Sequence, residues 1–178
     1  MSIVSDIEKL KKEKNAVILA HYYVDEDVQD IADYIGDSFY LSKVATKVDQ
    51  DRIIFAGVEF MGESAKILNP DKRVFMPDMN ADCPMAHMAD KEEILKLREE
   101  YDDLAVVCYI NSTAELKKYS DVCVTSSNAV KIVKNLPNKN IFFIPDRNLG
   151  HFVAKQCPDK NFIPAPPEDS TCACNECN

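Results

Sequence analysis

The strongest constraint on the fold of this chain is an internal repeat, in which residues 107–160 match residues 19–72 without a gap. Signals typical of strands, helices and turns recur in phase in the two copies, so one supersecondary unit is used twice. The matched pairs are Leu19–Ala20 with Val107–Cys108, His21 with Tyr109, Asp33 with Asp121, Ser38 with Ser126, Ile53–Phe55 with Ile141–Phe143, and Pro70–Lys72 with Pro158–Lys160.

Each copy alternates apolar runs with helical patterns, and this order predicts parallel sheets with helices on both faces. Expected strands are 16–20, 52–56 and 74–76, and expected helices are 3–14, 26–35, 39–47, 59–68 and 91–100. The predicted fold is therefore α/β, a pseudo-symmetric repeat of three-layer α/β/α units with small parallel sheets. We expect a first unit with an N-terminal helix and the Cys83 loop (1–85), a second unit (86–164) and a cysteine-rich tail (165–178).

Charge and hydropathy exclude several classes of function. A net charge of -9 and a pI near 4.8 argue against nucleic acid as a partner, because nucleic acid requires a basic surface. An anionic small molecule stays possible, since helix N-termini bind anions without net positive charge. No apolar run approaches ~20 residues, so no membrane span is expected, and no signal peptide is evident. The expected location is the cytoplasm.

Seven cysteines, an odd number in a chain expected in the cytoplasm, argue against a disulfide framework. Cys108 and Cys123 lie in apolar runs and are expected in the core, and Cys157 is expected to be inert. Cys83 follows the apolar run 74–76 and Pro77, on a loop that could present a thiolate to a metal or hold an ordinary half-buried thiol. The last three cysteines, Cys172, Cys174 and Cys177, have the close spacing of metal ligands.

Polar side chains follow the expected strands in both copies, where parallel sheets bind ligands. They are His21 and Tyr23 in the first copy, and Tyr109, Asn111 and Ser112 in the second. Ser38 and Ser126 are expected at helix N-termini, where a hydroxyl and free N–H groups hold carboxylate or phosphate. Each of these residue types also has a purely structural interpretation. The serines could only cap their helices, the tyrosines could only pack, and the histidine could be a polar residue whose hydrogen bonds are satisfied within the protein.

Several longer stretches resemble one known family, the quinolinate synthases, which are iron–sulfur enzymes of NAD biosynthesis. They are AHYYVDEDVQDIADYIGDS, FAGVEFMGESAKILNPDK, PDMNADCPMA, YINSTAELK, TSSNAV and PDRNLGHFVAK, which together span nearly all of residues 15–160. The resemblance implies three pseudo-symmetric units around one central site. It also implies a [4Fe–4S] cluster held by one cysteine from each unit, with an open iron that acts as a Lewis acid.

The resemblance also implies the substrates and the residue roles. Family members condense iminoaspartate with dihydroxyacetone phosphate to give quinolinate, which links them to the L-aspartate oxidase that supplies iminoaspartate. Cys83 matches the first cluster ligand, and His21 and Tyr23 match a pair that supports proton transfer. Tyr109 matches a substrate-contacting tyrosine near the cluster. The matched substrate-binding positions are His21, Ser38, Tyr109, Asn111 and Ser126.

The chain departs from the family after the second copy. The tail after Ile163–Pro164 resembles the segment that normally follows the third unit, and Cys177 lies where the third ligand is expected. We therefore expect that the third unit is missing, and with it the second of the three cluster ligands, which should follow the second unit. Cys172 or Cys174 could complete a rearranged cluster or a zinc site. The alternatives to an enzyme are a non-catalytic protein that binds metal or small anions, and a remnant that binds nothing.

Overall fold

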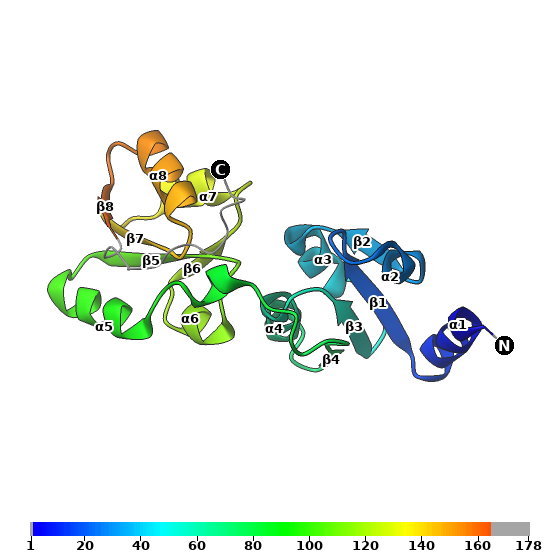
Figure 1. Ribbon diagram of the computed structural model, residues 1–178. Coiled ribbons are helices and arrows are strands. Elements are labelled where there is room, and N and C mark those ends of the chain that lie inside the picture. Colours follow the sequence, from blue (N-terminus) through cyan, green and yellow to red (C-terminus); the bar gives the residue numbers. More distant parts are fainter. Residues whose placement is uncertain (1, 165–178) are drawn as a thin grey trace. The chain divides into compact units, whose positions relative to one another are not determined.

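The fold was determined from a computed structural model, which describes residues 2–164. These residues form two compact units, with the boundary between Asp82 and Cys83. Cysteines 172, 174 and 177, and with them the expected tail 165–178, lie outside the described residues. Each unit is an all-parallel sheet of four strands flanked by helices, which confirms the predicted α/β class (Figure 1).

The sheet of the first unit has the strand order β2-β1-β3-β4. Its strands are β1 (Ala16–His21), β2 (Tyr34–Gly36), β3 (Arg52–Ala56) and β4 (Arg73–Phe75). The central strands β1 and β3 carry continuous aliphatic runs because both of their faces are covered, as is usual in parallel sheets. The edge strands β2 and β4 are short and carry exposed side chains.

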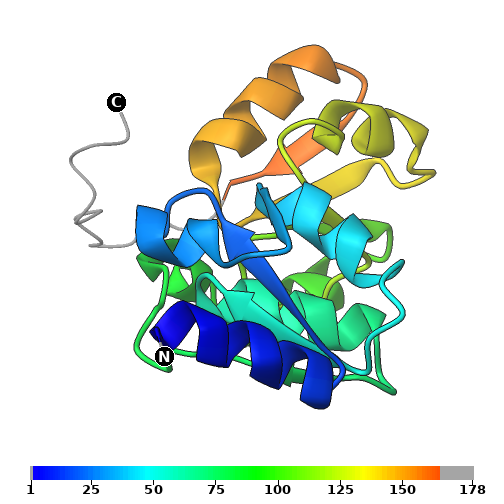
Figure 2. The same cartoon turned by 90° about the vertical axis from the view of Figure 1, so that its right-hand side faces the viewer.

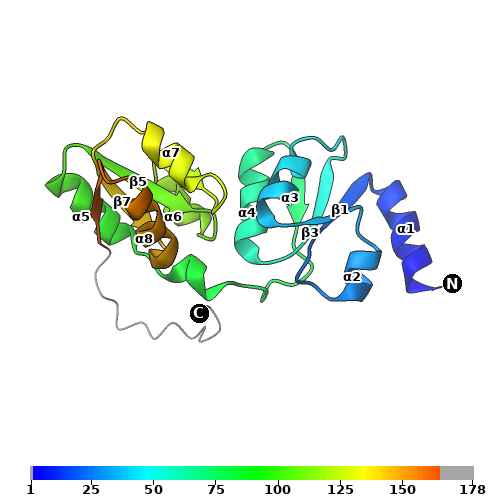
Figure 3. The same cartoon turned by 90° about the horizontal axis from the view of Figure 1, so that it is seen from above.

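Helices cover both faces of this sheet. They are α1 (Ile3–Glu13), α2 (Glu26–Asp30), α3 (Ser38–Ala45) and α4 (Glu59–Leu68). In Figure 3, α3 and α4 lie together on one side of β1 and β3, and α1 lies on the other side. The covers are unequal: α3 and α4 bury large side chains such as Leu41 and Phe60, whereas α1 buries none.

The second unit repeats this plan with the strand order β6-β5-β7-β8. Its strands are β5 (Leu104–Tyr109), β6 (Val122–Val124), β7 (Asn140–Ile144) and β8 (Asn161–Ile163). Its helices are the short 3₁₀ helix η1 (Pro84–His87), α5 (Lys91–Glu100), α6 (Ala114–Lys118), α7 (Ala129–Asn135) and α8 (Arg147–Gln156). Figures 1 and 2 show α8 beside the β7–β8 edge of the sheet.

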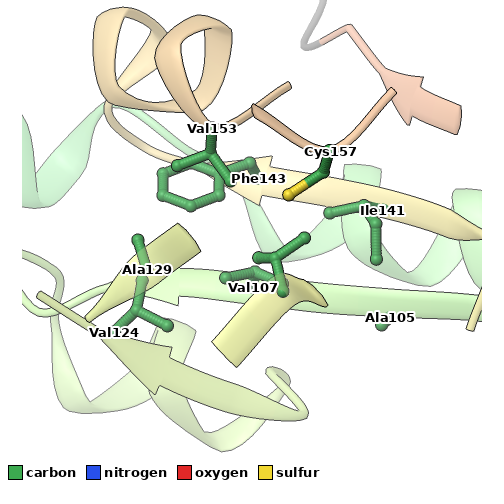
Figure 4. Packing of buried hydrophobic residues seen from close by; sticks show 9 residues of the cluster. Ala105, Val107, Val124, Ala129, Ile141, Phe143, Val153 and Cys157 are labelled. Carbon is green, nitrogen blue, oxygen red and sulfur yellow. The ribbon is translucent and has the colours of Figure 1, made fainter. Parts of the chain in front are cut away.

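Two apolar layers hold the second unit together. On one face, Ala129 of α7 and Val153 of α8 pack with Val107 and Phe143 (Figure 4). The opposite face carries a second cluster, with members from α5, α6, β5 and β7: Ile94, Leu97, Leu104, Val106, Cys108, Leu116, Phe142 and Ile144. Because residues of a strand alternate between faces, β5 contributes to both layers.

The repeat seen in the sequence is also a repeat of hydrogen bonds. In the first unit the Asp33 carboxylate accepts from the Ile18 N–H at 2.8 Å, and the Asp33 N–H donates to the Ile18 carbonyl at 2.9 Å. Asp121 and Val106 form the same two bonds in the second unit, at 2.7 and 2.9 Å. Each aspartate thus ties the start of an edge strand to the central strand beside it.

Two sequence-based expectations, one about a helix and one about a core cysteine, are wrong. The expected helix 26–35 ends at Asp30, and Tyr34–Gly36 instead forms the edge strand β2 beside β1. Pairing with β1 overrides the helical pattern, because it satisfies backbone groups that a short exposed helix would leave to water. Cys123 is the second: it lies on the edge strand β6 and is exposed, whereas Cys108 is buried as expected. Cys157 is buried as well.

Candidate functional site

In each unit, the candidate site residues lie at the carboxyl ends of the central strands. In each sheet the chain leaves the first central strand toward one edge and later returns to the other side, so the strand order reverses between β1 and β3 and between β5 and β7. Parallel sheets bind ligands in the crevice beyond the strand ends at such a point. His21 and Tyr109 are the last residues of β1 and β5.

His21 is buried, with 6% of its surface exposed, although it ends a strand. Its Nδ1 accepts a hydrogen bond from the Tyr23 N–H at 3.3 Å, which leaves Nε2 as the atom that can carry the proton of the neutral ring. Burial lowers the pKa of His21, and the nearby Asp37 carboxylate opposes this shift. The imidazole is therefore neutral at pH 7 and able to accept a proton.

The two tyrosines after His21 pack against its ring. Tyr22 stacks on the imidazole with ring centroids 4.5 Å apart, and Tyr23 meets it edge-on at 4.7 Å. A side-chain hydrogen bond with Tyr23 raises the pKa of Tyr22. Tyr23 itself is 82% exposed, so its hydroxyl is available to a ligand. The three rings form one cluster at the end of β1.

Sequence reasoning overlooked two members of this cluster, Tyr22 and Asp37. Tyr22 directly follows His21, but a position in the sequence does not show which ring stacks on the imidazole. Asp37 becomes a neighbour of His21 only because Gly36 pairs with His21 across β1 and β2. Because residues 26–35 were expected to form one helix, the sequence did not predict the strand β2, and so it did not predict that Asp37 lies near His21.

Ser38 is the first residue of α3, as expected, but it does not cap the helix. Asp37 is the cap, and its carboxylate accepts from the Tyr40 N–H at 2.7 Å. The negative charge of Asp37 makes this helix end less suitable for an anion. What Ser38 offers a ligand is therefore its hydroxyl, on a half-buried side chain.

Asn111 carries the clearest mark of a binding group in the second unit. Its side-chain oxygen Oδ1 is buried and accepts no hydrogen bond from any described residue. Buried carbonyl oxygens are nearly always paired, so such an atom calls for a donor from a ligand or water. Tyr109, two residues earlier, is half-buried, and its carbonyl accepts from the buried Ser112 hydroxyl at 2.8 Å.

Ser126 does not lie where the sequence placed it. The helix α7 begins at Ala129 with Asn128 as its cap residue, and Ser126 is an exposed residue of the preceding turn. Asn128 Oδ1 accepts from the Thr125 N–H at 2.7 Å and closes this turn. Ser126 is thus not at a helix N-terminus, although its exposed hydroxyl can still contact a ligand.

Cys83 lies directly before the 3₁₀ helix η1 and is half-buried. The Ala86 N–H donates to its carbonyl at 2.9 Å, and this turn holds the cysteine at the boundary of the second unit. Across residues 2–164, no three His, Cys, Asp or Glu side chains gather closely enough to hold a metal ion. Cys83 suits one ligand position of an iron–sulfur cluster, and the other expected ligand, Cys177, lies outside the described residues.

Taken unit by unit, the structure brings His21, Tyr23 and the neighbouring Tyr22 and Asp37 together in the first unit. In the second unit it places Tyr109 and Asn111 after the same strand. Fold and site together define a class: a repeat protein of parallel α/β units whose polar side chains collect at the ligand-binding ends of the strands. The helices of the described chain are too short or too polar to cross a membrane.

Comparison with known proteins identifies the family. The model of the quinolinate synthetase A protein family matches residues 5–176. A quinolinate synthase from Fusobacterium nucleatum subsp. nucleatum is 66% identical over 157 residues, which cover 88% of this chain and 53% of the relative. The chain belongs to the quinolinate synthetase A family, and the family resemblance read from its motifs is confirmed.

Two further relatives agree. Quinolinate synthases from Clostridioides difficile and Clostridium perfringens (strain 13 / Type A) are each 56% identical to the chain. The match covers 88% and 92% of this chain, and 52% and 54% of the relatives, respectively. The chain thus spans about half the length of the curated relatives it matches.

Proposed function

We propose that this chain derives from, and carries two units of, a quinolinate synthase that condenses iminoaspartate with dihydroxyacetone phosphate in de novo NAD biosynthesis. Membership of the family supports the reaction class. The structural observation that carries the proposal is the buried His21 at the carboxyl end of β1, with a lowered pKa and an exposed tyrosine hydroxyl beside it. A condensation that loses water and closes a ring needs proton transfers at one place, and a neutral imidazole supports them.

Each residue of the candidate site has its own proposed role. His21 donates its Nε2 proton to the substrate and takes a proton back at the same nitrogen, and Tyr23 hydrogen-bonds the same substrate group through its hydroxyl. Tyr109 and Asn111 orient the substrate, with Asn111 Oδ1 accepting from a substrate donor that would pair this buried oxygen. The hydroxyls of Ser38 and Ser126 contact substrate oxygens. An L-aspartate oxidase is the proposed supplier of iminoaspartate, because oxidation of the aspartate amine gives that imine.

A [4Fe–4S] cluster is the proposed cofactor, with Cys83 and Cys177 as ligands and Cys172 or Cys174 as candidates for the third position. Thiolates are the usual ligands of such clusters, and a bound cluster with an open iron would supply a Lewis acid. A fourth thiolate on that iron would remove this function. The chain by itself is therefore expected to form little or no quinolinate.

Activity is best tested with the chain alone and with a chimera. The chimera joins residues 1–163 to the carboxyl-terminal part of the Fusobacterium nucleatum quinolinate synthase, which is 66% identical to this chain. Both proteins are reconstituted anaerobically with iron and sulfide and given iminoaspartate and dihydroxyacetone phosphate. Chromatography should detect quinolinate from the chimera and almost none from the chain. Turnover by the chain at the relative's rate would disprove the expected loss of activity.

Two variants of the chimera test the residue roles. His21→Gln should lower kcat by about 10²-fold or more, the usual contribution of a general acid–base group. Asn111→Leu should raise KM, because it removes the oxygen that the substrate is proposed to pair. An unchanged kcat and KM in both variants, with quinolinate still formed, would reject these roles.

The alternative is a non-catalytic remnant that binds metal or small anions, and it is favoured by the acidic, cysteine-rich tail. The iron, sulfide and zinc contents of the reconstituted chain distinguish the proposed iron–sulfur protein from the non-catalytic remnant. Iron with equimolar sulfide, lost in Cys83→Ser, supports the proposed cluster. Zinc without sulfide supports the alternative, and a chimera that makes no quinolinate despite holding iron and sulfide would reject the enzyme.

A further inference from the structure

Cys108 and Cys123 are direct partners on neighbouring parallel strands, although 15 positions separate them in the chain. The register pairs Cys108 of β5 with Cys123 of β6. Paired residues of adjacent strands lie about 4.8 Å apart and point to the same face of the sheet. The two thiols interact directly through a side-chain hydrogen bond. The fold therefore places two thiols side by side at the edge of the second sheet.

The two cysteines differ in exposure. Cys108 lies in the apolar layer under α5 and α6 and is 0% exposed. Cys123 lies on the edge strand β6 and is exposed. An oxidant in solution therefore reacts first with Cys123, and Cys108 lies beside it on the neighbouring strand.

The surroundings of Cys108 favour its thiolate. The interaction with the Cys123 side chain is the largest cause that lowers the pKa of Cys108, to about 7, and the nearby hydroxyl groups of Ser112 and Ser120 and the Lys117 ammonium add to this effect. Burial opposes the shift. The same hydrogen bond raises the pKa of Cys123, so the pair holds one proton between its two sulfurs near neutral pH.

We propose that Cys108 and Cys123 are a redox-active dithiol, which hydroperoxides oxidise to a reversible disulfide between β5 and β6. The strand spacing of about 4.8 Å lies within the Cα separation of about 4.4–6.8 Å that a disulfide requires. The pair is distinct from Cys83 and from the tail cysteines that the cluster would use.

The reaction balances with the hydroperoxide as the only oxidant. The Cys123 thiolate, formed when the shared proton moves to Cys108, attacks the outer oxygen of the hydroperoxide, which breaks the O–O bond and gives a sulfenic acid. The leaving alkoxide takes the proton back from Cys108 and departs as an alcohol, so that Cys108 becomes a thiolate. The Cys108 thiolate then attacks the Cys123 sulfur, and the hydroxyl leaves as water after taking a proton. One thiol, one thiolate, one hydroperoxide and one proton from solvent thus give one disulfide, one alcohol and one water, and a dithiol reductant reverses the change.

Mass spectrometry tests this directly. The full chain, without iron and fully reduced, is treated with hydrogen peroxide, alkylated and cleaved with trypsin. Because Lys117 and Lys118 lie between the two cysteines, each falls in its own tryptic peptide, 99–117 or 119–131. We expect these two peptides to appear joined after peroxide and separate again after dithiothreitol.

Matched variants and a denatured sample complete the experiment. Cys123→Ser, at an exposed position, should abolish the joined peptides, whereas the buried Cys157→Ser should leave them unchanged if circular dichroism shows a native fold. In urea the preference for this pair should fall to that of any other two cysteines. Two outcomes would overturn the proposal. In the first, Cys123 is oxidised to sulfinic acid while Cys108 can still be alkylated in the denatured product. In the second, Cys123 of the native chain pairs equally with other cysteines.

Discussion

Burial sets the acid–base behaviour of His21 more than its neighbours do. A protonated imidazole in a buried position loses hydration, and the single nearby carboxylate, Asp37, does not compensate for this loss. The rings of Tyr22 and Tyr23 cover the imidazole and contribute to its burial. The same residue that sequence reasoning chose for proton transfer is therefore held in its neutral form at pH 7.

This burial predicts a pH dependence of stability. The pKa of His21 in the folded chain lies below 6.5, its value in the unfolded chain, so the unfolded chain takes up the proton first as the pH falls. The free energy of unfolding should thus decrease from about pH 6.5 down to the lowered pKa. Urea unfolding of the native chain and of His21→Gln, across this range, measures the effect. The variant should lose this part of the pH dependence, and identical profiles would contradict the prediction.

At the scale of the elements, one aspartate in each unit joins an edge strand to the centre of its sheet. Asp33 also forms an ion pair with Lys11 at 2.9 Å, and Asp121 forms one with Arg98 at 2.9 Å. Each carboxylate therefore links a strand N–H, through its hydrogen bond, with a basic side chain of the helix that precedes the first strand. This linkage explains why both aspartates recur at matched positions of the repeat.

Replacing either aspartate should destabilise its own unit. Asp33→Ala and Asp121→Ala each leave a strand N–H without its charged acceptor and should lower the free energy of unfolding by about 1–2 kcal/mol, reduced from the buried case by partial exposure. The matched Asp→Asn variants keep an acceptor oxygen and lose only the ion pair, so they should cost about 0.5 kcal/mol. Urea denaturation followed by circular dichroism measures both. Equal losses in the Ala and Asn variants would show that charge, and not the hydrogen bond, matters.

The first helix of each unit covers its sheet to a different extent. A cavity of about 460 Å³ lies between α1 and the sheet of the first unit, lined by apolar side chains that include Leu10, Ile18 and Ile54. In the second unit, Ile94 and Leu97 of α5 fill the corresponding space and are buried. Part of the difference comes from one matched position, which is Ala16 in the first unit and the buried Leu104 in the second.

Filling this cavity should stabilise the first unit. Ala16→Leu copies the residue found in the second unit and should raise the free energy of unfolding by about 0.5–2 kcal/mol. The reverse change, Leu104→Ala, removes a buried side chain and should lower it by about 2–5 kcal/mol. Thermal and urea unfolding of the three proteins gives the comparison. A lower stability of Ala16→Leu would mean that α1 cannot move to accept the larger side chain.

At the scale of the whole molecule, the two units share one topology and differ in packing. Both faces of the second sheet carry clusters of buried side chains, whereas the α1 face of the first sheet does not have an equal cover. Local stability follows the density of buried apolar contacts. The units are therefore expected to open with different free energies.

Hydrogen exchange tests this difference. Backbone amides of β5 and β7 should exchange more slowly than those of the matched strands β1 and β3, because opening the second sheet exposes more apolar surface. Peptide-resolved exchange followed by mass spectrometry gives the rates, with each strand compared with its counterpart in the repeat. Equal protection, or faster exchange in β5 and β7, would show that the α1 cavity does not weaken the first unit.

Much of this molecule was predictable from the sequence. Repeats, apolar runs and turn residues are local or periodic signals, and they led to the α/β class, the central strands and the placement of His21 and Tyr109 at strand ends. Short edge strands have no such local signal. Residues Tyr34–Gly36 continue a helical pattern in the sequence, and only their pairing with β1 makes them a strand. The start of α7 was misplaced for a related reason, since the turn is closed by Asn128 and not by Ser126.

By itself, the sequence determined the doubled α/β plan and the family, because periodic hydrophobicity and ordered motifs are properties of the chain alone. Only the tertiary structure decided that Asp37 lies near His21, that Asn111 Oδ1 is buried without a described partner, and that Cys108 and Cys123 are paired across β5 and β6. Each of these depends on strand pairing or on packing between segments distant in the chain. Such contacts arise when backbone hydrogen bonds and apolar burial are satisfied together, and no single segment encodes them.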